Sequence, residues 1–356
     1  MRKRKIGIGA ASLLCVAIGL VLGFVVLLVV DPSGAGVAFV TMLQNFFYFP
    51  RADVALEYFG GTLVQAAPLS LCAISVIYAK SAGLFNIGAS GQFTAGAITA
   101  LYLAIACNCP WWVCLPAAIL AGGIAGALAG LLKAYRSVNE VISGILMNWI
   151  LLYTANTVLT PYTDSNTYTL DLVTNRPDAL IPTLGLDRLF SGNETVTLAL
   201  LLTPALAFLA KFILARTRLG FETRAVGLNP AAAELSGMFE KRNVVITMFI
   251  AGAFSGAAAG TLFLSGAETW QCSAAIVPSI GFNGIAAAYL GALDPFGALL
   301  ASYFISHIQQ GSLHMDRLIY PQEVASLVIA VTIYASAFAA FLSQLIAKRR
   351  KKEAVS

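Results

Sequence analysis

Long apolar segments separated by short polar connections make up almost the whole chain. A bilayer core of about 30 Å requires roughly 20 apolar residues in a helix, and ten segments reach or approach that length. The segments at 280–293 and 296–311 are the shortest. The pattern predicts an all-α polytopic membrane protein with ten crossings, at residues 6–30, 62–79, 83–106, 115–132, 138–159, 195–214, 244–264, 280–293, 296–311 and 324–347.

The composition strengthens this prediction and adds an orientation. Apolar residues make up 58% of the 356 residues and charged residues 11%, whereas soluble domains contain about 25% charged residues. With the ten spans above, 18 of the 22 Lys and Arg residues fall on one side of the membrane and 4 on the other. Basic residues concentrate on the cytoplasmic side, so both termini are predicted to be cytoplasmic. The net charge of +5 therefore reflects membrane orientation and predicts no nucleic-acid partner.

Two connections are longer than the others. Residues 160–193 carry three prolines and four aspartates and are predicted to form an external loop, whereas the basic residues 215–243 are predicted to be cytoplasmic. The apolar run 6–30 exceeds the roughly 7–15 residues of a signal-peptide core, so we expect an uncleaved first helix. Residues 1–356 are therefore predicted to form a single transmembrane domain in the bacterial cytoplasmic membrane.

Polar residues enter the third predicted span at residues 83–99. Asn86, Ser90 and Gln92 lie among four glycines, in a segment that continues into an apolar run. An unpaired amide in hydrocarbon costs roughly 2–7 kcal/mol, so such a segment must lie against protein or beside water. A tightly packed helix with its polar groups satisfied internally is one interpretation. We favour the other, a translocation pathway.

Glycines recur at four-residue spacing in two other spans. Gly122, Gly126 and Gly130 form one such row, and a second row is formed by Gly252, Gly256 and Gly260. Small residues at this spacing allow helix backbones to approach closely in membranes. Both rows are therefore predicted to form close helix contacts.

The ten spans divide into two groups of five, which predicts an inverted repeat because five is odd. Aligning the third span with the eighth sets FNIGASG (85–91) beside GFNGIAAA (281–288), each with a Phe-Asn pair before small residues. Interrupted spans at corresponding positions of two inverted halves surround the substrate site in many transporters. Asn283 therefore joins the pathway candidates, although glycine- and alanine-rich helices also resemble one another by chance.

Residues that would carry other chemistry are few. The chain contains no GxxxxGK[ST] phosphate-binding loop, and Glu140 and Glu268 lie only at span ends. Proton-coupled transporters keep acidic residues deep in the bundle, so the energy source is predicted to lie elsewhere. We interpret His307 and His314, with Asp316, as surface or interfacial residues and predict no metal site. Cys107, Cys109 and Cys114 share one external turn, where either a disulfide or packed free thiols would fit.

The cytoplasmic connection contains signals for one short helix. Asn229 is a favourable N-cap, Pro230 suits the first helical position, alanines follow, and Gly237 is a typical C′ residue. A helix of two turns is marginally stable alone in water. We therefore expect a partner or the membrane domain to hold it, with a simple interfacial connector as the alternative.

Four segments together resemble a known family: GLFNIGASGQF (83–93), NEVISGILMNWI (139–150), RAVGLNPAAAELSGM (224–238) and GFNGIAAAYLG (281–291). In this order and spacing they are similar to permease subunits of ATP-binding-cassette importers for ribose, branched-chain amino acids and nucleosides. The nucleoside branch, which works with a substrate-binding lipoprotein, is the most similar. Ser90 stands where that branch usually has Glu. The resemblance implies a non-enzymatic pore subunit, a second permease or second copy of this chain, and a cytoplasmic ATPase that binds ATP and Mg²⁺.

The resulting hypothesis is inward transport of a small polar solute, most simply a nucleoside, driven by ATP hydrolysis on a partner. A sugar, a riboflavin-like heterocycle, a stand-alone secondary transporter and a membrane-embedded enzyme are the alternatives. The predicted pathway residues are Asn86, Ser90, Gln92, Asn148 and Asn283. The resemblance assigns ATPase coupling to Arg224, Gly227, Asn229, Pro230, Ala231, Ala232, Ala233, Glu234 and Gly237.

Overall fold

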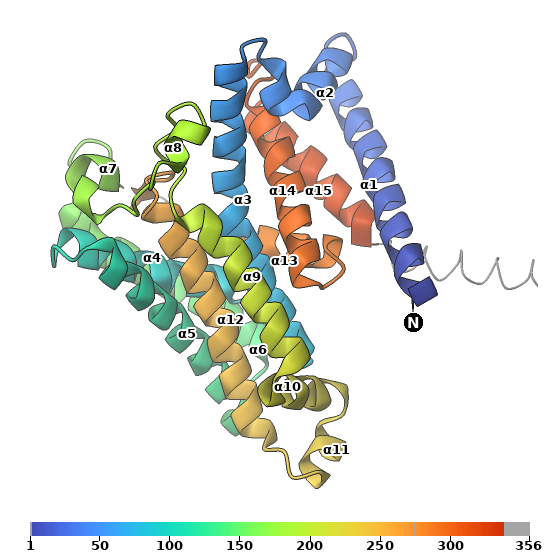
Figure 1. Ribbon diagram of the computed structural model, residues 1–356, viewed down its shortest axis with the longest axis vertical. Coiled ribbons are helices and arrows are strands. Elements are labelled where there is room, and N and C mark those ends of the chain that lie inside the picture. Colours follow the sequence, from blue (N-terminus) through green and yellow to red (C-terminus); the bar gives the residue numbers. More distant parts are fainter. Residues whose placement is uncertain (1, 273–274, 338–356) are drawn as a thin grey trace, which may run out of the picture.

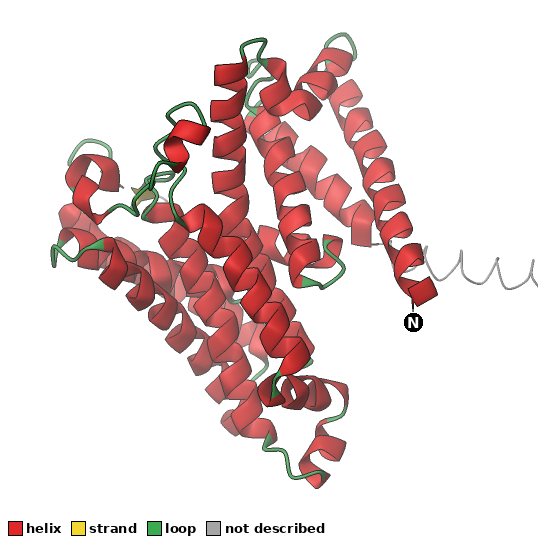
Figure 2. Cartoon of the chain, in the orientation of Figure 1, coloured by secondary structure: helices red, strands yellow, loops and turns green. Residues whose placement is uncertain are grey.

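The computed structural model describes residues 2–272 and 275–337 of the chain. Nearly all of the regular structure in this part is helical (Figure 2). A single short antiparallel pair joins β1 (Thr169–Leu170) to β2 (Trp270–Gln271) within the described residues. The principal helices are α1 (Arg2–Val30), α2 (Ala35–Gln44), α3 (Ala52–Ser81), α4 (Ala89–Ile105), α5 (Trp111–Arg136), α6 (Glu140–Leu159), α9 (Ala199–Arg216), α10 (Arg218–Leu228), α11 (Pro230–Leu235), α12 (Glu240–Phe263), α13 (Ile280–Leu290), α14 (Pro295–Ser312) and α15 (Gln322–Ala337).

The bundle has two distinct ends, named here by the elements that lie at them (Figure 1). The α11 end carries α10 and α11. The α2 end carries α2 and the 160–193 connection, which contains the short helices α7 (Leu172–Asn175) and α8 (Leu186–Leu189). Helices α1 and α15 pack as a pair on one side of the bundle. Helix α3 is the central element, because it packs against α9, α12, α13 and α14 and almost all of its residues from Thr62 to Ala79 are buried.

The two predicted glycine rows pack directly on each other, which confirms the expected close helix contact. A Cβ atom added at Gly126 of α5 would lie 2.1 Å from the Met248 carbonyl oxygen of α12. One added at Gly252 of α12 would lie 2.2 Å from the Gly122 carbonyl oxygen. No side chain fits between backbones this close, so only glycine permits this α5–α12 packing.

The predicted class, an all-α polytopic membrane protein, is confirmed. Five described helices are long and apolar enough to cross a membrane: Ala52–Ser81, Trp111–Arg136, Glu140–Tyr162, Ala199–Arg216 and Glu240–Phe263. Shorter apolar helices occupy Val16–Val30, Ala89–Ile105 and Ile280–Leu290. Part of the predicted last span, residues 338–347, lies outside the described residues.

Two predicted boundaries are wrong in an informative way. The span predicted at 280–293 is an 11-residue helix, α13, which rises only about 16 Å. It ends where Ala292 and Leu293 adopt positive φ. Conversely, α3 begins at Ala52, ten residues before the predicted start, after Arg51 in an extended conformation. Hydropathy alone missed this first part of α3 because it mixes charged and aromatic residues.

Candidate functional site: a polar pocket and the coupling end

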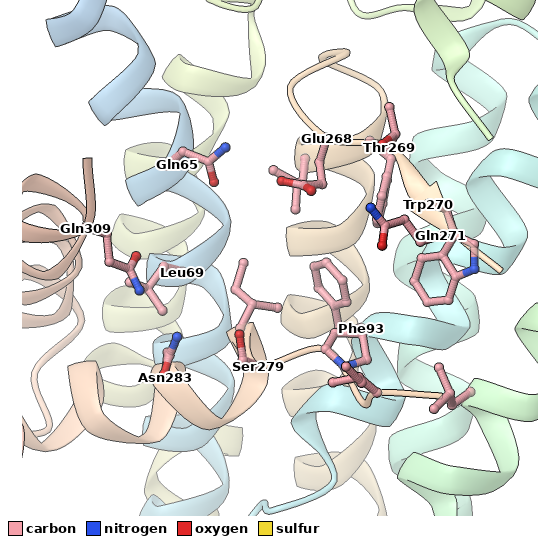
Figure 3. A pocket seen from close by; sticks show the side chains of 16 residues that line it. Gln65, Leu69, Phe93, Glu268, Thr269, Trp270, Gln271, Ser279, Asn283 and Gln309 are labelled. Atoms are coloured by element: carbon pink, nitrogen blue, oxygen red, sulfur yellow. The ribbon is translucent and has the colours of Figure 1, made fainter. Parts of the chain in front are cut away.

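A pocket of about 330 Å³ opens between α3, α4, α6, α12, α13 and α14. Its volume lies at the lower end of the roughly 300–1,000 Å³ typical of small-molecule sites. The segment that joins α12 to α13 supplies one wall, and α3, α13 and α14 supply the wall opposite (Figure 3). The polar and aromatic lining residues are Gln65, Phe93, Phe263, Glu268, Thr269, Trp270, Gln271, Ser279, Asn283 and Gln309.

Aromatic rings form a continuous surface within the pocket. The ring centroids of Phe93 and Phe263 are 5.9 Å apart, and those of Phe263 and Trp270 are 5.8 Å apart. Trp270 is held in place twice. Its indole Nε1 donates to Asn156 Oδ1 at 3.2 Å, and its backbone belongs to the β1–β2 pair. The three rings are tilted against one another and at most 5% exposed, so they give the pocket a fixed aromatic wall that a flat ring can contact.

The amide groups of the lining are free to bind a solute. Within the described part of the chain, the side chains of Gln65, Asn283 and Gln309 have no protein hydrogen-bond partner. All three point into the pocket from the wall opposite Glu268 (Figure 3). Each amide both donates and accepts, so this wall suits a neutral solute with mixed hydrogen-bonding groups.

Glu268 is the one ionisable residue among the described residues that line the pocket. Its side chain is exposed to the pocket, yet the surrounding walls displace enough water to raise the pKa of its carboxyl above the ordinary value. The described lining contains no Lys, Arg or His. The site is therefore polar, with at most one negative charge.

Four of the five predicted pathway residues lie buried beside this pocket and are not part of its lining. Asn86 Nδ2 donates to Ser75 Oγ at 2.9 Å and to Gln92 Oε1 at 2.8 Å, and Gln92 Nε2 returns a bond to Asn86 Oδ1 at 3.0 Å. Asn148 Oδ1 accepts from the Gly91 N–H at 2.7 Å, and its Nδ2 donates to the Ile87 carbonyl.

In this conformation these amides are satisfied internally, as in the packed-helix interpretation. Of the five predicted residues, Asn283 alone lines the pocket. A role for Asn86, Ser90, Gln92 and Asn148 in contacting solute stays a prediction.

Helix α13 closes the pocket on the side of the α11 end. A Cβ atom at Gly281 would lie 2.4 Å from the backbone nitrogen of Ser90 on α4, and one at Gly284 would lie 2.7 Å from Cys72 Cβ on α3. This contact, together with the Asn86–Gln92 pair, is called the floor of the pocket below. A solute can pass the floor only if α13 and α4 separate.

The predicted short helix is present at the α11 end with the predicted caps. Asn229 Oδ1 accepts from the Ala232 N–H at 3.1 Å, and Pro230 occupies the first helical position. At the other end Gly237 has φ of +79°, and the N–H of Met238 donates to the Ala233 carbonyl at 3.0 Å. With the bond from Gly237 N–H to Glu234 O, this is a Schellman motif.

Large apolar side chains are exposed at this end among charged ones. Leu228 is 88% exposed and Leu235 is 91% exposed, and Phe239 follows in the connection to α12. The residues assigned to coupling are exposed except for Gly227, which is half-buried, and Ala233, which is buried. The exposed leucines were missed from the sequence because a Leu in a helix usually indicates the buried face.

Helix α10 joins this surface to the floor. Thr223 Oγ1 donates to Asn243 Oδ1 of α12 at 3.1 Å, and a Cβ atom at Gly227 would lie 2.3 Å from the Ser81 carbonyl oxygen at the end of α3. Gly83, at φ +76°, belongs to the same contact, because a Cβ atom added there would lie 3.1 Å from the Gly227 carbonyl oxygen. The α10 backbone therefore contacts the segment that leads through Asn86 into α4.

Comparisons with known proteins assign the family. The model for the permease component of branched-chain amino acid transport systems matches residues 58–337. The chain belongs to this permease family. A guanosine ABC transporter permease of Bacillus subtilis is 33% identical over 84% of this chain and 86% of its own length. A nucleoside ABC transporter permease of Lactococcus lactis is 32% identical over 77% and 78%, and a glucose ABC transporter permease of Haloferax volcanii is 32% identical over 81% and 75%. No solved structure matches the chain.

As a member of this family the permease is a multi-pass transport subunit and not an enzyme. The cysteines of the external turn and the two histidines have the following surroundings. Cys107, Cys109 and Cys114 are free thiols, with Cys114 Sγ donating to the Cys109 carbonyl oxygen at 3.5 Å. His307 lies between Asn45 and the Leu43 carbonyl, and His314 stacks on Tyr48.

The permease carries pocket residues that sequence reasoning missed. Gln65 and Gln309 are amides in apolar helices, and Glu268, Trp270 and Gln271 lie in the connection between the predicted spans 244–264 and 280–293. A polar amide inside an apolar span can be recognised in the sequence. The position of the connection over the pocket cannot be recognised there, because it depends on how α12 and α13 pack.

Proposed function

We propose that this permease moves a nucleoside inward across the cytoplasmic membrane, driven by ATP hydrolysis on a partner subunit. The observation that carries the proposal is the composition of the pocket. An aromatic surface, uncommitted amides and one carboxylate match the flat base and the hydroxyl groups of a neutral nucleoside. The names of the guanosine and nucleoside permeases similar to this chain support the same solute class.

The composition of the pocket favours a nucleoside over a branched-chain amino acid, despite the family's description. A carboxylate is bound most strongly by a cation, and the described lining contains no cationic residue. The apolar side chain of a branched-chain amino acid also offers no hydrogen-bonding groups to the free amides. A sugar satisfies the charge condition, but the three neighbouring rings suit a planar base better.

The orientation follows from the charge distribution. The α11 end includes the most basic connection, residues 215–243, and is therefore cytoplasmic under the positive-inside rule. Both termini lie inside in this topology of ten crossings. Helix α13 forms part of the proposed eighth crossing.

Helix packing supports an inverted repeat in the central part of the permease. Helix α5 packs on α12, and correspondingly α14 packs on α3. In the same way, α4 packs on α12 and α13 packs on α3. This is the pattern expected if α3, α4 and α5 correspond to α12, α13 and α14. The pocket lies between these two sets of helices, where inverted repeats hold their substrates.

The partners follow from the surfaces at the two ends. The exposed α11 helix with Leu235, together with Leu228 at the end of α10, docks into a cytoplasmic ATPase, which holds ATP and Mg²⁺. A second permease, a homologue or another copy, completes the translocation unit. A substrate-binding lipoprotein delivers the solute at the α2 end. Movement of α10 against the Gly83 segment then separates α4 from α13 and opens the floor.

The proposal is tested by reconstituting the permease in liposomes with its partner ATPase and binding protein. We expect uptake of labelled guanosine that requires ATP and the ATPase. Uptake that continues without the ATPase would identify a stand-alone transporter instead. Labelled glucose or riboflavin transported in place of guanosine would change the solute class.

A variant pair tests the docking surface separately. Leu235→Asp places a charge on the exposed face of α11 and is expected to abolish co-purification of the ATPase. Leu318→Asp is the matched control, because Leu318 is 96% exposed at the opposite end. Equal co-purification of the ATPase with both variants would refute the coupling role of α11.

A further inference from the structure

Glu268 has no structural role that the described residues reveal. Its carboxylate forms no hydrogen bond or ion pair with any of them, and its side chain faces the pocket (Figure 3). An ionised carboxylate accepts hydrogen bonds and donates none. It therefore pairs with solute groups that can donate hydrogen bonds to it.

The two walls of the pocket differ in hydrogen-bonding chemistry. Gln65, Asn283 and Gln309 lie on one wall and both donate and accept, whereas Glu268 lies across from them (Figure 3). The edge of a nucleobase carries both donors and acceptors, as the amide wall does. The adjacent N1–H and N2–H₂ donors of guanine would also suit a carboxylate, so the test below removes the hydroxyl groups and leaves the base unchanged. A ribose presents two neighbouring hydroxyl groups, and two donors match the two oxygens of one carboxylate. An acidic residue binds the ribose hydroxyl in dinucleotide sites for the same reason.

The segment that carries Glu268 is held in position. Trp270 and Gln271 pair with β1, and the Leu264 carbonyl accepts from the Ile181 N–H at 2.8 Å. Glu268 therefore lies on a connection fixed at both sides. A carboxylate held in this way can select among solutes.

We propose that Glu268 binds the 2′- and 3′-hydroxyl groups of a ribonucleoside and selects ribonucleosides over their 2′,3′-dideoxy analogues. This inference rests on the proposed function, since it assigns a part of the same solute to one wall of the same pocket. The same carboxylate is expected to disfavour nucleotides, because a phosphate would bring a second negative charge beside Glu268 with no cation in the described lining.

The test compares wild type with Glu268→Gln in liposomes that contain the same ATPase and binding protein. Guanosine and 2′,3′-dideoxyguanosine are the two labelled solutes. Replacing a charged acceptor by a neutral amide weakens both hydroxyl contacts, so guanosine uptake is expected to fall about tenfold. Uptake of the dideoxy analogue is expected to remain unchanged. Glu57→Gln, an exposed glutamate of α3 outside the pocket, is the matched control and should leave both rates at wild-type values.

External pH gives a second readout that a purely structural role would not produce. The raised pKa means that Glu268 loses its charge, as pH falls, before an ordinary glutamate does. No other ionisable residue among those described lines the pocket, so its protonation is not coupled to a neighbour. The wild-type preference for guanosine over the dideoxy analogue should shrink in this acidic range, whereas Glu268→Gln should have the same small preference at every pH.

The outcomes distinguish the ribose assignment of Glu268 from the proposed transport of nucleosides. Equal loss of both solutes in Glu268→Gln, or no loss of either, would overturn the ribose assignment and leave nucleoside transport standing. A wild-type permease that transports neither solute with its ATPase and binding protein would overturn the proposed function itself.

Discussion

Replacing Gly227 by alanine tests whether α10 transmits movement from the coupling end to the floor. The added Cβ atom would lie 2.3 Å from the Ser81 carbonyl oxygen, 2.7 Å from the Ala82 carbonyl carbon and 2.8 Å from the Gly83 nitrogen. All three are backbone atoms and cannot rotate away. Ordinary contact begins near 3.4 Å, so α10 must move about 1 Å away from the Gly83 segment.

The consequence of this displacement can be estimated. Overpacking of this kind costs roughly 1–3 kcal/mol, and a loss of coupling energy of that size corresponds to about a 5–150-fold change. The exposed face of α11 is not touched by the substitution. We therefore expect Gly227→Ala to retain the ATPase but to lose at least about fivefold in guanosine uptake and in solute-stimulated ATP hydrolysis.

The assay measures three quantities on the same preparation: permease abundance, ATPase co-purified per permease, and uptake per permease. Gly36→Ala is the matched control, because a Cβ atom at Gly36 of α2 has no neighbour within 4 Å. Wild-type uptake by Gly227→Ala would refute a tight α10 contact as the link. A parallel fall in abundance and uptake would assign Gly227 to folding and not to coupling.

Two further predictions concern packing. Asn86→Leu leaves Gln92 Nε2 without its 3.0 Å acceptor and should destabilise the detergent-solubilised permease by about 1–3 kcal/mol. The double variant with Gln92→Leu should cost less than the sum of the two, and strict additivity in thermal unfolding would argue against the pair. Gly252→Ala, which sets a Cβ atom 2.2 Å from the Gly122 carbonyl oxygen, should lower both melting temperature and membrane abundance. Wild-type values would contradict the α5–α12 packing.

The local features of this protein could be predicted from sequence because local physics determines them. Asn229, Pro230 and Gly237 act through hydrogen bonds and backbone angles within a few residues, and the caps form where they were predicted. The glycine rows have a regular four-residue spacing, which allows two helix backbones to approach closely. Two such rows in one membrane protein therefore predict a close contact, and the structure confirms that they meet each other.

The pocket could not be predicted in the same way, because its residues come from six helices and one connection. Asn86 and Gln92 are conspicuous in sequence as amides inside an apolar segment, yet six residues separate them and they bond each other. Gln65 and Gln309 look less conspicuous and face the pocket. Whether an intramembrane amide binds a neighbour or a solute depends on what lies opposite, which is a tertiary property.

The segment between α3 and α4 connects the two proposed activities of the permease. Gly83 touches Gly227 of α10 at one end of the segment, and Asn86 bonds Ser75 and Gln92 at the other. A displacement of α10 therefore reaches the floor through about four residues, without passing through the lipid-facing helices. This segment packs closely on Gly227, and packed interiors are weakly compressible, so it can transmit a displacement. In the proposed transport cycle, the pairing of Asn86 with Gln92 would fix the floor to the segment that contacts α10.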